Sequence, residues 1–91
     1  MMQFVLEIPW AGSIKEKRSV VSSVKDRLQR KFKLSVAEID LQRSVGFAHM
    51  GAAVVSNSRQ HGEKILNKAL TLLEEEIDAG LRDVEIYSEN F

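Results

Sequence analysis

The start of the first expected helix combines a capping residue with several basic side chains. Ser13 can cap the helix, and Lys15, Lys17 and Arg18 follow within about one turn. Amide N–H groups at a helix start lack intrahelical acceptors and the dipole is positive there, which favours an anion or a phosphate group. Glu16 opposes this, because a Ser followed three residues later by Glu forms a capping box that uses these donors. An anion site and a capping box are both open interpretations.

Basic residues also continue along this helix. Residues 15–33 hold eight Lys and Arg against two acids, a net +6, whereas residues 63–91 hold three against eight, a net −5. At about 100° per residue, five cations share the outward arc of the helix, and such a stripe is typical of surfaces that follow phosphates. A solvated helix face is the alternative. The five cations are Lys15, Arg18, Lys25, Arg30 and Lys33.

Lys17 differs from these cations because its angular position lies between Val24 and Val21, inside the apolar stripe. The usual arrangement for such a lysine is a stem that lies on the core and an ammonium group that snorkels to solvent. We expect this arrangement, with a functional role as the alternative.

Catalytic signals are sparse. His49 and His61 belong to different elements and do not have the spacing of metal ligands, and there is no cysteine or glycine-rich phosphate loop. Glu38 and Asp40 share a strand face about 7 Å apart, where carboxylates usually keep an edge strand soluble. We therefore expect no catalytic residue, no metal site and no cofactor, and keep an enzyme acting on a small anion at the helix start as a third hypothesis.

The elements that must position these residues follow from hydrophobic periodicity. In the second strand the pattern places Ala37, Ile39 and Leu41 inward. The chain predicts strands at 2–8, 36–41, 49–55 and 83–87, and helices at 14–32 and from a cap at Asn57 or Ser58 to a left-handed stop at Gly80.

The resulting order is β-α-β-β-α-β, for which right-handed crossovers place both helices on one face of a four-stranded antiparallel sheet. The sequence thus predicts an α+β, ferredoxin-like sandwich that forms a single domain over residues 1–91. The open face should be either a self-association surface or a wetted face. Because its central positions lack aromatic platforms, RNA binding in the manner of an RNA-recognition motif is not expected. The predicted open-face residues are Gln3, Val5, Glu7, Glu38, Asp40, Asp83, Glu85 and Tyr87.

Composition limits the class of protein. The 91 residues have a formal net charge of zero and are 44% hydrophobic and 29% charged, which is typical of a globular domain. The apolar runs are far shorter than the roughly 20 residues of a membrane span, and the N-terminus lacks a basic leader. We expect a cytoplasmic protein that makes no contact with membranes.

Several blocks of the sequence resemble the YlxP-like family of small bacterial proteins of unknown function. The blocks lie at 13–18, 25–28, 35–38 and 54–57, together with Phe32. The resemblance implies a ferredoxin-like fold. Members are often encoded beside translation initiation factor two and ribosome-binding factor A, which implies work on the ribosome or on RNA. The family has no established catalytic residue, and its usual Asp-Leu-Trp-Gln-like segment is replaced here by Arg-Ser-Val-Gly at 43–46.

The leading hypothesis is a non-enzymatic accessory protein that contacts ribosomal RNA or a ribosomal particle through the first helix. The alternative is a homodimer formed through the open sheet face. The candidate nucleic-acid or anion-binding residues are Ser13, Lys15, Lys17, Arg18, Lys25, Arg30 and Lys33.

Overall fold

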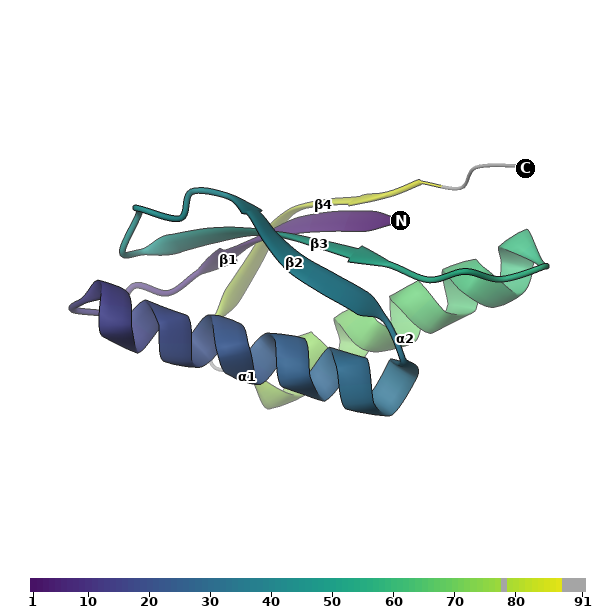
Figure 1. The fold of residues 1–91 in the computed structure, drawn as a ribbon, viewed down its shortest axis with the longest axis horizontal. Helices are drawn as coiled ribbons and strands as arrows, with labels where there is room; N and C mark the ends of the chain where they lie inside the picture. The colour runs from purple at the N-terminus through teal and green to yellow at the C-terminus, as the bar shows by residue number, and fades with distance from the viewer. Residues whose placement is uncertain (78, 88–91) are drawn as a thin grey trace.

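The computed structural model describes residues 1–77 and 79–87, and its elements follow the predicted order (Figure 1). Four antiparallel strands form one sheet in the order β2-β3-β1-β4, and both helices lie against the same face of that sheet. The α+β ferredoxin-like fold is therefore confirmed. The elements are β1 (Met2–Glu7), α1 (Ile14–Phe32), β2 (Ser35–Asp40), β3 (Phe47–Ala53), α2 (Arg59–Glu76) and β4 (Gly80–Ile86).

The core lies between the sheet and the two helices. Strand β1 occupies a central position, and its Met2, Phe4, Leu6 and the following Ile8 are fully buried. Each such side chain contributes about 1.5–3 kcal/mol through its removal from water. Strand β3 and the inward stripes of the helices complete the core with Ala48, Met50, Ala52, Val21, Val24, Leu28, Leu66, Ala69, Leu72 and Leu73.

The assignment of the two faces of β2 in the sequence prediction was wrong. Val36 is buried, whereas Ala37 and Ile39 are exposed on the face away from the helices. A bulge places Ile39 and Asp40 together opposite one β3 residue, and the Ile39 side chain then lies over Gly51. A Cβ atom at Gly51 would lie 3.3 Å from Ile39 Cγ2, so a larger residue there would displace Ile39.

The bounds of β3 and β4 also differ from the prediction. Strand β3 begins two residues earlier than expected and leaves Val54 and Val55 outside the sheet. Strand β4 begins at Gly80, and a bulge sets Asp83, with φ 51°, beside Val84. Because of this bulge, Arg82 rather than Asp83 pairs opposite Val5 on the open face.

Helix α1 begins and ends with defined caps. The Glu16 amide donates to Ser13 Oγ at 3.2 Å, and the Gly12 amide donates to Glu16 Oε2 at 3.2 Å, so the predicted capping box forms but reaches one residue further back. The helix ends at Lys33, which adopts the left-handed conformation with φ 54° and donates its amide to Gln29 O.

Helix α2 confirms one predicted boundary and contradicts the other. The Ser58 hydroxyl accepts from the His61 amide at 3.3 Å, which confirms the cap. The helix ends at Glu76, because Ile77 is already extended and packs against the core. The predicted stop at Gly80 was wrong, since that residue has no positive φ and pairs with Glu7 in the sheet instead.

Lys33 offers a test of the α1 terminus. A Cβ-bearing residue in the left-handed conformation is strained by roughly 1 kcal/mol, and glycine removes the strain. We expect Lys33→Gly to raise the melting temperature by about 2–8 °C in thermal unfolding. A Lys33→Ala variant keeps the strain while removing the charge, and an equal gain for both variants would contradict the explanation.

Candidate nucleic-acid interface

The predicted basic stripe lies on the solvent side of α1. Lys15, Arg18, Arg30 and Lys33 are exposed and Lys25 is half-buried. From the first to the last of these positions the helix rises about 27 Å at 1.5 Å per residue. The face is therefore long enough to meet several phosphate groups of one nucleic-acid chain.

Ion pairs neutralise part of this basic surface. Arg30 Nε lies 3.0 Å from Asp26 Oδ1, one turn earlier on the helix. Arg27 reaches across to α2, where its Nη1 lies 3.4 Å from Glu76 Oε2 and 3.5 Å from the Glu76 carbonyl oxygen. Such exposed pairs contribute about 0–1 kcal/mol to stability, but they lower the positive charge that the helix presents.

Five cations of the α1 segment remain without an ion-pair partner among the described residues. Four belong to the predicted set, and Lys31 is an addition that its position on the flank of the helix had concealed. We call this set the free cations: Lys15, Arg18, Lys25, Lys31 and Lys33.

At the helix start, the amides of Gly12 and Glu16 donate to side chains of the capping box. The Ser13 hydroxyl and the Glu16 carboxylate form the cap described above, so this carboxylate sits beside the position predicted for an anion. Lys15 and Arg18 flank the cap from exposed positions. The first turn therefore has the geometry of a capping box. The positive charge near the helix start comes from the exposed side chains of Lys15 and Arg18.

Lys17 lies inside the molecule, so the snorkelling prediction was wrong. Lys17 is only 1% exposed. Its Nζ lies 2.9 Å from Glu38 Oε2 and donates to the Leu41 carbonyl oxygen. Leu41, the acceptor of this bond, has a left-handed backbone conformation with a φ of 63°. Lys17 therefore links α1 to the end of β2 and does not belong to the outward basic face. The sequence signal for this buried pair was a lysine on the inward face of the helix together with an acid on a strand. It becomes recognisable only when Glu38 is assigned to the inward face of β2.

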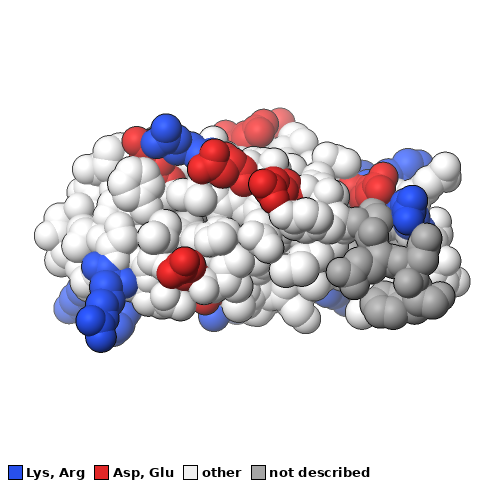
Figure 2. Space-filling model, turned by 90° about the horizontal axis from the view of Figure 1, so that it is seen from above, with Lys and Arg blue, Asp and Glu red and all other residues white. Residues whose placement is uncertain are grey.

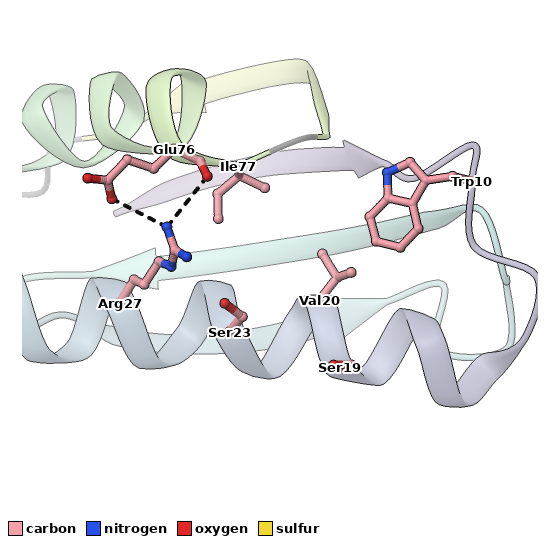
Figure 3. Close-up of a pocket in the computed structure, with 7 residues that line it drawn as sticks. All are labelled: Trp10, Ser19, Val20, Ser23, Arg27, Glu76 and Ile77. Carbon is pink, nitrogen blue, oxygen red and sulfur yellow. Dashed lines mark hydrogen bonds and ion pairs between the residues drawn. The ribbon is translucent and has the colours of Figure 1, made fainter.

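A groove between the helices was not anticipated from the sequence. It has a volume of about 220 Å³ and lies between α1 and the end of α2, with Trp10 at one end (Figure 3). Ser19 and Ser23 of α1 face it, and Arg27 stands at the opposite end beside Glu76. The sequence signal for it was the single tryptophan of the chain, Trp10, between the first expected strand and helix; in the structure this residue is 51% exposed.

The open sheet face is uncharged at its centre. Figure 2 views this side and shows charged residues mainly along the margins of a broad uncharged area. Val5, Ile39 and Phe47 are among its apolar residues, and Glu7 pairs with Arg82 at 3.3 Å. Glu38, which was predicted to lie here, is on the helix side instead. The face is therefore less acidic than the sequence pattern indicated.

Neither a metal site nor a membrane helix is found in the described part of the chain. No group of three or more His, Asp or Glu residues is placed to hold an ion there. Neither α1 nor α2 combines the length and apolar character that crossing a bilayer requires.

The fold and this surface define a small ferredoxin-like α+β protein with a basic helix. The family model described as "Protein of unknown function (DUF503)" matches residues 1–86, and the chain belongs to this family. The chain is also similar to "Uncharacterized protein YlxP" of Bacillus subtilis (strain 168), with 41% identity over 64 residues that cover 70% of each protein. The resemblance found in the sequence blocks is thus confirmed at the level of the family.

The Lys17 link predicts a distinctive pattern of stability changes. Lys17→Met preserves the apolar stem but leaves Glu38, which is 19% exposed, without its cation. We expect this change to lower the free energy of unfolding by about 3 kcal/mol, whereas Lys17→Met with Glu38→Met should cost only about 1 kcal/mol because no charge is stranded. Urea unfolding measures both values. Lys15→Met is the exposed control and should change stability by less than about 0.5 kcal/mol; a Lys17→Met variant as stable as this control would contradict the role of the link.

Proposed function

We propose that this protein is a non-enzymatic accessory protein that binds structured RNA, such as ribosomal RNA within a ribosomal particle, through the outward face of α1. The observation that carries the proposal is the set of free cations along some 27 Å of one helix. Cations without intramolecular partners can release phosphate counterions on binding, which is the main source of affinity for nucleic acids.

The distribution of charge supports binding from one side. The chain has no net charge, yet α1 is basic while Glu74 and Glu75 are exposed at the end of α2 and Glu85 lies in β4. A polyanion is attracted to one surface and repelled by the other, so the protein would meet RNA in a preferred orientation. The sheet face is a weaker candidate, because Gln3, Val5 and Gly51 occupy its centre, and the His49 ring beside them is hydrogen-bonded to Gln3.

We predict that binding to an RNA hairpin with a stem of ~16 base pairs weakens steeply with salt. If the five free cations each neutralise one phosphate, affinity should fall about 100- to 500-fold between ~50 and ~200 mM salt. Reversal of Lys15, Arg18 and Lys25 to Glu should weaken binding at least ~10-fold. It should also lower the slope of log affinity against log salt concentration by the amount expected for about three phosphate contacts. Fluorescence anisotropy of the labelled hairpin measures both effects.

The chain offers a matched control for this experiment. Arg59, Lys64 and Lys68 are exposed on α2, and their reversal to Glu changes the net charge by the same amount. This control should lose much less affinity than the α1 variant. Equal losses would mean that only net charge matters, and absence of salt-sensitive binding to the hairpin or to ribosomal subunits would refute the proposal.

A second candidate function is weak self-association, with the open sheet face of one copy against that of another. Its uncharged centre favours this occupant, because the centres of two copies of this face would bring apolar rather than charged side chains together. Four strands of six or seven residues span about 400 Å², which is half of the roughly 800 Å² per partner of a stable complex. Any dimer formed by the sheet alone should therefore be weak and reversible.

Sedimentation equilibrium tests this second candidate. We expect an increase in average mass toward ~100 µM, well above micromolar affinity, and its loss in Val5→Glu because the new carboxylates would face each other. Lys64→Glu, on the exposed side of α2, is the control and should behave as the wild type. A strictly monomeric wild-type protein at the highest concentration would rule the dimer out.

A further inference from the structure

We propose that the groove between α1 and α2 is a nucleotide subsite in which one unpaired base of the bound RNA stacks on Trp10. This inference rests on the proposed function and adds a single-stranded element to it. The groove brings together an exposed aromatic ring and two hydroxyl groups, and the exposed Lys15 lies one helical turn before Ser19. These are the three kinds of group that recognise the base, sugar and phosphate of a nucleotide.

Trp10 supplies the aromatic surface. The residue follows β1 in the loop before α1 and keeps about half of its surface exposed. In Figure 3 its indole ring stands at the end of the groove beside Val20, while Ile77 contributes an apolar side chain from the opposite wall. A planar base could therefore contact the indole and lie against apolar side chains. Bases stack on aromatic residues with little preference for sequence, so this contact would not by itself select a particular nucleotide.

The α1 wall of the groove supplies polar groups in a regular row. Lys15, Ser19, Ser23 and Arg27 follow one another at intervals of four residues and so lie on one side of the helix, about 6 Å apart. The two serines border the groove, where their hydroxyl groups can meet a ribose. Lys15 is one of the free cations and extends the row at the end nearer the start of the helix.

The charges at the two ends of this row, Arg27 and Lys15, determine at which end of the groove the phosphate of the nucleotide would lie. Arg27 is already bound to the carboxylate and the carbonyl oxygen of Glu76, so its end of the groove carries a compensated charge and an acid. Lys15 has no such partner among the described residues. A phosphate is therefore favoured at the Lys15 end, which continues directly into the outward face of α1. The strand of an RNA loop would leave the groove along the same helix that binds its stem.

The size of the groove suits a small planar group. A volume of about 220 Å³ accommodates a base and part of its sugar. The alternative occupant is an apolar side chain of another protein, which would bury the indole without any need for a phosphate. The experiment below separates these cases.

Trp10 is the only tryptophan of the chain, so its fluorescence reports on the groove directly. The probes are a single-stranded oligouridylate, the same ribose-phosphate polymer without bases, and a fully paired RNA duplex that has no loop. We expect the oligouridylate to quench Trp10 and the abasic polymer to bind without comparable quenching. Trp10→Ala should weaken oligouridylate binding about tenfold or more while leaving the affinity for the fully paired duplex unchanged, and Trp10→Phe should retain most of the affinity because it keeps an aromatic ring.

The outcomes distinguish this inference from the proposed function. The nucleotide subsite would be overturned, with the proposed function intact, if the hairpin binds but oligouridylate does not quench Trp10 and Trp10→Ala does not change the affinity for oligouridylate. Equal quenching by the abasic polymer would assign the signal to phosphate and would also overturn the subsite. Failure of every RNA probe to bind the wild-type protein would overturn both. Circular dichroism of each variant, with Trp10→Phe as the milder change, shows that a loss of affinity does not come from unfolding.

Discussion

The arrangement of this molecule depends on one buried ammonium group. Lys17 enters the core from α1 and must be paired there, because an isolated charge removed from water is costly. Glu38 and the Leu41 carbonyl oxygen meet this requirement, and they do so only if Glu38 points toward the helices. The link therefore fixes the facing of β2 and ties the strand's end to α1. It also leaves Ile39 on the open side of the sheet, where it covers Gly51.

The same link separates two surfaces with different properties. It draws one lysine and one carboxylate into the interior, so the open sheet face is less acidic and α1 presents only its remaining cations to solvent. The pairs Arg27–Glu76 and Arg30–Asp26 reduce these cations further. What remains is the set of free cations on one helix, with a groove lined by Trp10 along its flank. A chain with zero net charge can in this way present a strongly directional surface to a polyanion.

The sequence predicted the features that depend on neighbouring residues. The alternation of β1, the capping box at Ser13 and the cap at Ser58 each involve residues within a few positions, and all three are present. The facing of β2 could not be predicted from its own alternation, because it depends on a lysine in a different element. The end of α2 was missed for a similar reason, since Ile77 leaves the helix to pack on the core. The groove joins Trp10, α1 and α2, which come together only in the folded chain.

Chemical-shift mapping tests the central claim, that the outward face of α1 is the RNA-binding surface. With isotopically labelled protein and the RNA hairpin, the account predicts amide shifts concentrated at residues 15–33, while the open-face positions Val5, Ile39 and Phe47 remain unchanged. Shifts that map to those sheet positions and leave the outward positions of α1 unaffected would contradict it.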